Sequence, residues 1–137
     1  MSYRYVIDTY AWVEYFVGSK MGAEAKTYIE TGRAATPTAV LAELKRWHLK
    51  KIEENSISHK DMLDNLDFVK TNAQMIPLDS PLAERAGETD FMMKKLRRDW
   101  SIIDSIILTT ARQEDAQIVT GDRHFEGLEK VILLKKE

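Results

Sequence analysis

The chain alternates between short apolar runs and longer amphipathic stretches. Short runs rich in β-branched and aromatic residues predict buried strands, and apolar residues spaced three and four apart predict helices. The predicted strands are residues 3–7, 34–36, 75–77, 117–120 and 131–134. The predicted helices are residues 10–17, 22–30, 37–54, 58–71, 79–97 and 101–113. Because helices separate most of the strands, we expect an α/β fold in which helices cover both faces of a parallel sheet.

Several of the predicted helices begin at residues that favour helix N-termini. Thr36 followed by Pro37 is typical of an N-cap with proline at the first helical position. Ser58 and Ser101 can cap the helices that follow them, and Asp79 precedes a helix with proline near its start.

Length and composition exclude several classes of protein. At 137 residues the chain has room for one substantial core, so we expect a single domain over residues 1–137. No apolar run is long enough for a signal peptide or a membrane span, and the chain has no cysteine. We therefore expect a cytoplasmic protein that does not bind membranes and has no disulfide, thiolate metal site or cysteine nucleophile.

The net charge of −2 provides no overall positive field for nucleic acid, but basic residues are clustered locally. One run lies in the third predicted helix and the other at the end of the fifth. Each run is also explained as an ordinary solvated helix face. The two runs are Lys45, Arg46, Lys50 and Lys51, and Lys94, Lys95, Arg97 and Arg98.

Two aspartates follow predicted strands. Asp8 follows the first strand, and Asp122 follows the fourth in the sequence Thr-Gly-Asp. Ligands of open parallel sheets bind in the crevice beyond the carboxyl ends of the strands, where both aspartates are expected. Each residue also has a simpler explanation, because aspartate caps helices and forms turns.

Two further acids lie on helices beside apolar residues. Asp104 shares a helix face with aliphatic side chains, and burying a carboxylate there costs several kcal/mol unless a helix cap or a cation compensates it. Its simpler role is a capping box with Ser101. Glu43 has the spacing for an ion pair with Arg46, yet it also borders the apolar flank of its helix.

Together the four acids predict a cation site. Four carboxylates in one crevice repel one another unless a divalent cation neutralises them. Oxygen ligands without cysteine or paired histidine favour Mg²⁺ or Mn²⁺ over Zn²⁺. We therefore expect one site for a hard divalent cation, formed by Asp8, Glu43, Asp104 and Asp122.

The order and surroundings of these acids resemble those of PIN-domain nucleases, and are most similar to the VapC-type toxins of prokaryotic toxin–antitoxin pairs. The resemblance covers essentially the whole chain. Its most specific parts are the Thr-x-Asp-x-x-Phe segment and the Asp-led apolar helix before it. The segments that carry it are Asp8-Thr9, residues 39–44, residues 103–111 and residues 120–125.

The resemblance implies a small three-layer α/β/α sandwich with a short central parallel sheet. It implies a metal-dependent endoribonuclease that leaves 5′-phosphate and 3′-hydroxyl ends, a homodimer, and a cognate antitoxin that blocks the site. Thr9 and Thr120 match positions that often carry a hydroxyl in the family, and we interpret them as donors that orient the aspartates. The implied catalytic and metal-binding residues are Asp8, Glu43, Asp104 and Asp122, with Mg²⁺ or Mn²⁺ as the cofactor.

An acidic pocket repels RNA, so basic groups around it are needed to gather the phosphates. The predicted RNA contacts are Lys45, Arg46, Lys50, Lys94, Arg97 and Arg98. The aromatic residues of the first helix are expected in the core or in a protein interface, rather than in base stacking; they are Tyr10, Trp12, Tyr15 and Phe16.

Three other functions stay open from the residues alone. A non-catalytic PIN-like RNA-binding module would keep the fold without cleaving RNA. A phosphoacceptor receiver domain would also bind Mg²⁺, but it needs an aspartate after a middle strand, and Asp79 is the candidate. A metal-free nuclease would use His48, His59 or His124 as acid and base.

Overall fold

The computed structural model describes residues 4–135, arranged around a five-stranded parallel sheet in the order β3-β2-β1-β4-β5. The strands are β1 (Tyr5–Ile7), β2 (Ala34–Pro37), β3 (Gln74–Ile76), β4 (Gln117–Thr120) and β5 (Val131–Leu133). The helices are α1 (Thr9–Val17), α2 (Lys20–Ile29), α3 (Thr38–Glu53), α4 (His59–Asn72), α5 (Ser80–Leu96) and α6 (Ile102–Glu114), with a 3₁₀ turn η1 (Arg123–Phe125). Residue 3, where the first strand was predicted to begin, lies outside the described residues.

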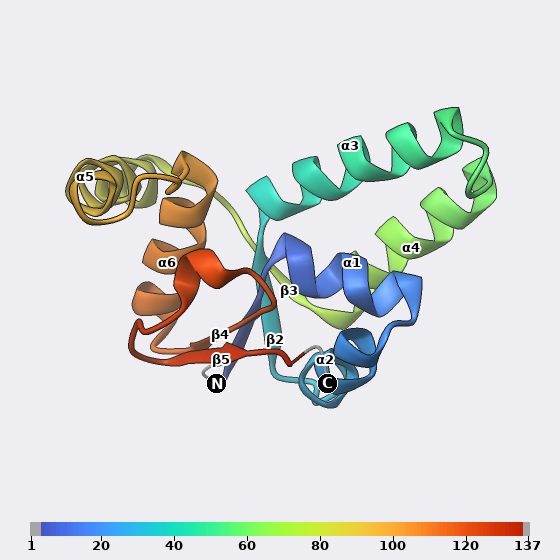
Figure 1. The fold of residues 1–137 in the computed structure, drawn as a ribbon, viewed down its shortest axis with the longest axis horizontal. Helices are drawn as coiled ribbons and strands as arrows, with labels where there is room; N and C mark the ends of the chain where they lie inside the picture. The colour runs from blue at the N-terminus through green and yellow to red at the C-terminus, as the bar shows by residue number, and fades with distance from the viewer. Residues whose placement is uncertain (1–3, 136–137) are drawn as a thin grey trace.

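The sheet has helices on both sides. Figure 1 shows α5 and α6 on one side, and α1, α2 and the α3–α4 pair on the other. All four pairings between neighbouring strands are parallel. The α/β sandwich predicted from the sequence is therefore confirmed.

Strand β1 at the centre of the sheet and its neighbour β4 carry fully or almost fully buried side chains. In β1, Val6 and Ile7 are completely buried, and in β4, Ile118 and Val119 are at most 1% exposed. Strands covered by helices on both faces bury both sets of alternate side chains, which explains their continuous apolar sequence. Trp12 of α1 is also fully buried in this core.

Three of the predicted helix caps are formed. Ser58 and Ser101 cap α4 and α6, each in a capping box with the aspartate three residues later. The side chain of Asp79 accepts a hydrogen bond from the backbone N–H of Leu82 at the start of α5. These interactions are local in sequence, so short motifs predict them well.

The cap predicted at Thr36 is wrong. Strand β2 continues through Pro37, which occupies the N-cap position of α3 without a side-chain hydrogen bond. The buried hydroxyl of Thr36 instead donates to the backbone carbonyl of Ile7 and accepts from the indole N–H of Trp12. Pairing with the neighbouring strand and helix thus overrides the local capping preference.

The strand order also locates the functional crevice. The chain fills the sheet outward from β1 to β2 and β3 on one side, and to β4 and β5 on the other. The order therefore reverses between β1 and β4, and such a switch point opens a crevice at the carboxyl ends of the strands. Asp8 directly follows β1, and Asp122 lies two residues after β4. No helix among residues 4–135 combines the length and apolarity needed to cross a membrane.

Candidate active site

A cavity of about 440 Å³ opens at the switch point between β1 and β4. The structure brings all four predicted acids to its walls. They come from four separate parts of the chain: the end of β1, helix α3, helix α6 and the turn after β4. The polar residues that line the cavity are Asp8, Thr9, Glu14, Glu43, Ser101, Asp104, Asp122 and His124.

Asp8 is the most deeply buried of the four acids. It is 3% exposed and caps α1, with its Oδ1 atom 2.8 Å from the backbone nitrogen of Ala11. Burial raises the pKa of Asp8 to about 7, although the hydrogen bonds from Thr120 and Ala11 favour the ionised form. The negative charges of nearby acids raise the pKa further. A buried carboxylate in this electrostatic setting is stabilised by a cation.

Thr120 connects two of the acids. Its hydroxyl donates to Oδ2 of Asp8 and accepts from the backbone N–H of Asp122 at 2.8 Å. Thr9, the other predicted hydroxyl donor, reaches Oε1 of Glu43 and not an aspartate. The two threonines therefore orient different carboxylates from opposite ends of the chain.

Asp104 combines the two roles that its sequence position allows. It completes the capping box of α6, with Oδ2 3.0 Å from the backbone nitrogen of Ser101. The same oxygen lies 2.9 Å from Nδ1 of His124. No described residue donates a hydrogen bond to Oδ1, and Asp104 lines the cavity although it is only 6% exposed. The cap bond therefore leaves one carboxylate oxygen available to a ligand.

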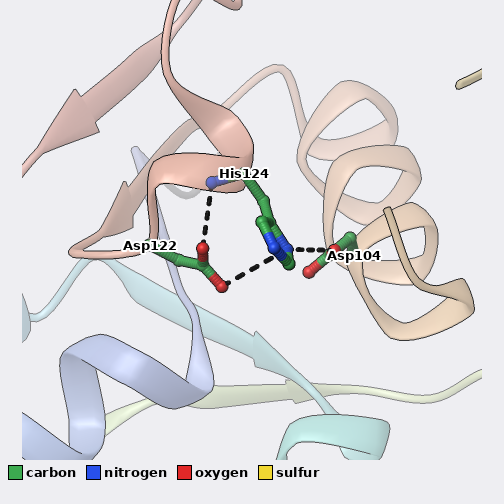
Figure 2. A group of neighbouring side chains, drawn as sticks. All are labelled: Asp104, Asp122 and His124. Atoms are coloured by element: carbon green, nitrogen blue, oxygen red, sulfur yellow. Dashed lines mark hydrogen bonds and ion pairs between the residues drawn. The ribbon is translucent and has the colours of Figure 1, made fainter. Parts of the chain in front are cut away.

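His124 is a member of the cavity wall that the sequence suggested only as a possible acid or base of a metal-free nuclease. Figure 2 shows its ring between Asp104 and Asp122, with Nδ1 at 2.9 Å from Asp104 Oδ2 and 3.6 Å from Asp122 Oδ2. Its backbone N–H donates to Asp122 Oδ1 at 2.9 Å, and its carbonyl accepts from Arg97 Nη1 at 2.7 Å. The Asp-x-His spacing directly after a strand could have indicated that His124 belongs to the site. A single histidine, however, lacks the paired spacing by which zinc ligands are recognised.

The charge of His124 depends on these neighbours. Burial alone would lower the pKa of His124, because it disfavours the charged imidazolium. The hydrogen bond to Asp104 and the charges of Asp122, Asp104 and Asp99 outweigh burial and raise the pKa above its ordinary value. These acidic neighbours therefore favour the protonated ring in the metal-free protein, whereas His124 would have to be neutral to act as a metal ligand.

The donor atoms fit a divalent cation. Asp104, Asp122 and His124 each offer one ligand atom, and these atoms lie within 4.8 Å of one another. Asp8 and Glu43 add further carboxylate oxygens to the same cavity. A set made mainly of carboxylate oxygens suits Mg²⁺ or Mn²⁺. Glu43 is half-buried and forms no ion pair with Arg46 among the described residues, in keeping with its inward orientation.

The six predicted RNA-binding residues lie outside the cavity wall. Five of them are exposed on the surfaces of α3 and α5 or in the turn after α5; they are Lys45, Arg46, Lys50, Lys94 and Arg98. Arg97 differs, because it is half-buried and its guanidinium is engaged with the carbonyl of His124. Arg97 therefore supports the wall of the cavity.

The structure disfavours two of the alternative functions. Asp79 follows β3, which is an edge strand, so it does not occupy the central position of a receiver phosphoacceptor. His48 is completely buried, with Nδ1 2.7 Å from the carbonyl of Leu44 and Nε2 3.1 Å from the amide of Asn65. Of the three histidines, His124 alone lines the acidic cavity, and a metal-free acid–base pair of histidines is not assembled there.

Comparisons with known proteins agree with this geometry. The sequence profile of the PIN domain matches residues 5–131. No curated protein sequence gives a significant match.

Several solved structures share the fold. A chain of VapBC2 from Rickettsia felis, bound to a promoter DNA fragment, aligns with a TM-score of 0.71 at 20% identity, covering 94% of this chain and 96% of that one. DNA-bound VapBC from Salmonella typhimurium gives 0.71 at 16% identity, covering 96% of each chain. VapC20 of Mycobacterium tuberculosis, a toxin that cleaves the sarcin–ricin loop, gives 0.70 at 19% identity, covering 96% of this chain and 99% of that one.

Proposed function

This chain belongs to the PIN domain family, and we propose that it is a divalent-metal-dependent endoribonuclease, the toxin of a toxin–antitoxin pair. The observation that carries the proposal is the convergence of Asp8, Glu43, Asp104 and Asp122 on one cavity at the switch point of the sheet. VapBC proteins, to which several of the similar structures belong, are a family of toxin–antitoxin systems, which supports a cognate antitoxin as partner. We further propose a homodimer that acts in the cytoplasm.

The carboxylates that line the cavity, with His124 beside them, would hold Mg²⁺ or Mn²⁺. When bound, such a cation supplies charge neutralisation for the phosphate and lowers the pKa of a water molecule. The similar VapC20 toxin cleaves the sarcin–ricin loop, which supports an RNA phosphodiester as the substrate.

The protein's own groups prepare the site for hydrolysis. Asp8 must be ionised to act as a ligand, and the hydrogen bonds from Thr120 and Ala11 favour that form against the effect of burial. Asp104 and Asp122 are each held at one oxygen by a backbone N–H. A second carboxylate oxygen, on Asp122 or on Asp104, is the candidate general base that accepts a proton from the attacking water.

The proposal is tested by incubating the protein with structured and unstructured RNAs, with Mg²⁺ or Mn²⁺ and with EDTA. We expect metal-dependent cleavage that leaves 5′-phosphate ends and that is lost in EDTA and in Asp104→Asn. The chain offers a matched control, because Asp61 holds the same capping-box position in α4, is exposed and does not line the cavity. Asp61→Asn should therefore alter a helix cap and leave cleavage intact.

A thermal melt of the same variants adds a readout besides activity. Mn²⁺ should raise the melting temperature of the wild type and of Asp61→Asn, and leave Asp104→Asn almost unmoved. Cleavage that survives EDTA and leaves a cyclic phosphate would instead support a metal-free nuclease. RNA binding without cleavage in any metal would support the non-catalytic module.

A further inference from the structure

Tyr10 differs from the other aromatic residues of α1. Trp12 is fully buried, and Tyr15 and Phe16 pack around it, with Tyr15 stacked on Phe68 at a centroid distance of 5.4 Å. Tyr10 is 37% exposed, and its hydroxyl makes no hydrogen bond to any of residues 4–135. Core packing therefore explains three of these rings but leaves Tyr10 without a role.

Tyr10 lies between two cavities. It lines the acidic cavity, and it also lines a second cavity of about 670 Å³. Asp122 is the other residue that belongs to both walls, so the two cavities adjoin at these side chains. The remaining walls of the second cavity are a mixture of apolar and charged residues: Met21, Gly121, Leu133 and Leu134 with Arg123, Glu126 and Lys135.

Gly121 sets the position of the Tyr10 ring. A Cβ atom at residue 121 would lie 2.6 Å from Cε1 and 2.7 Å from Cδ1 of Tyr10. The ring can approach the backbone this closely only because glycine has no side chain. Alanine at this position would displace the ring, since the atoms it meets belong to a partly exposed side chain.

We propose that the second cavity is a nucleobase subsite, in which the Tyr10 ring stacks on an unpaired base adjoining the phosphate that is cut. This inference rests on the proposed function, because the acidic cavity must hold that phosphate. Stacking on aromatic side chains is how proteins hold unpaired bases without hydrogen-bonding their edges. The volume lies within the range of cavities that bind small ligands.

Arg123 supplies the charge that such a subsite needs. It lies beside Asp122 in the chain and lines the second cavity. Its present ion pair with Glu126, at 2.9 Å, is exposed, with 78% of the Arg123 side chain accessible. An exposed pair of this kind is weak, so the guanidinium can turn to a phosphate of the bound strand.

The subsite is tested by equilibrium binding of two fluorescein-labelled 12-nucleotide strands, oligo(A) and an abasic ribose-phosphate chain of the same length. The wild-type protein and its variants are used with Mn²⁺, and both strands carry phosphorothioate linkages, which resist hydrolysis, so that the strand is not cut. Adding Tyr10→Ala should weaken binding of oligo(A) about tenfold and leave the abasic chain unchanged. Tyr10→Phe should bind as the parent does, and Phe91→Ala is the matched control because Phe91 is an exposed aromatic residue that lines neither cavity.

Gly121→Ala provides an independent variant. Because it acts by displacing the same ring, it should weaken oligo(A) binding as Tyr10→Ala does, and the double variant should be no weaker than either one. Equal losses for oligo(A) and the abasic chain, or an oligo(A) affinity unchanged by Tyr10→Ala, would overturn the subsite. Either result would leave metal-dependent cleavage by the wild type intact, so failure of the subsite is distinguishable from failure of the proposed function.

Discussion

The hydroxyl of Thr120 donates a hydrogen bond to the carboxylate of Asp8, a residue 112 positions earlier in the chain. The same hydroxyl accepts from the backbone N–H of Asp122 at 2.8 Å. Thr120 ends β4 and Asp8 follows β1, so this interaction joins the carboxyl ends of the two strands between which the order of the sheet reverses. One side chain thereby sets the relative position of two of the four acids.

Thr120→Val should weaken metal binding. The substitution leaves the N–H of Asp122 without its acceptor, which costs about 1–3 kcal/mol of the free energy of unfolding. It also removes a hydrogen bond that lowers the pKa of Asp8, so less Asp8 is ionised at pH 7. Calorimetric titration with Mn²⁺ should show a lower affinity than in the wild type, with a smaller difference at pH 8.5.

The matched control for this variant is Thr110→Val. Thr110 is also completely buried, but its hydroxyl donates to the backbone carbonyl of Ile106 in its own helix, at 2.7 Å. The control removes the same atoms from a site away from the cavity, and Mn²⁺ affinity should not change. Equal affinities in both variants would show that the Thr120 hydroxyl does not tune the site.

The stability of the metal-free protein should depend on pH through Asp8. Its pKa is raised from 3.8 to about 7 on folding, mainly by burial. Between these values the native state binds more protons than the unfolded state, so the free energy of unfolding falls as the pH rises from about 4 to about 7. The loss from this group is on the order of 4 kcal/mol, and denaturant unfolding in EDTA at pH 5 and pH 8 measures it.

Asp8→Asn separates this contribution from the rest of the protein. Asparagine has no proton to lose, and its side-chain oxygen can still accept from Ala11, so the dependence on pH should become shallower and stability at pH 8 should rise. The raised pKa of His124 acts with the same sign, since its stabilising contribution is lost as the pH rises from its ordinary value through the folded value. A variant with the full wild-type pH dependence would contradict the assignment to Asp8.

Arg97 and Arg98 are neighbours with different expected roles. Arg97 is half-buried and holds the carbonyl of His124, whereas Arg98 is exposed. Arg97→Met should lower the turnover number about tenfold, because the free energy of one charge-assisted hydrogen bond corresponds to about that factor in rate. The salt dependence of RNA binding should not change. Arg98→Met should leave turnover unchanged and reduce the salt slope by about 1, if it contacts one phosphate. Identical salt slopes in Arg98→Met and the wild type would remove Arg98 from the RNA surface.

Two glycines in helices should respond to alanine with opposite signs. At Gly22 in α2, a Cβ would lie 2.0 Å from the backbone oxygen of Glu14, so α1 and α2 would have to separate. Gly22→Ala should therefore cost at least about 2–3 kcal/mol of the free energy of unfolding. At Gly87 in α5, a Cβ meets nothing within 4 Å, and Gly87→Ala should stabilise the protein by about 1 kcal/mol. Denaturant unfolding of both variants compares the two effects directly.

Local patterns in the sequence predict most of the elements and three helix caps. A short continuous apolar run locates β4, and the motifs beginning at Ser58 and Ser101 locate the starts of α4 and α6, because such runs and helix caps depend on residues close together in the chain. The positions of the four acids relative to these elements also indicate a cation site. Thr36 shows where local reasoning stops, since its hydroxyl bonds to a strand that is 29 residues away.

The tertiary structure decided how the site is assembled. Thr120 donates a hydrogen bond to Asp8, and Thr9 donates one to Glu43. His124 lies between two aspartates. These contacts depend on which strands are neighbours in the sheet. The sequence by itself determined the kinds of groups available and the strand ends and helices that carry them. Contacts between residues far apart in the chain depend on the packing of the whole sheet, and no single segment encodes that packing.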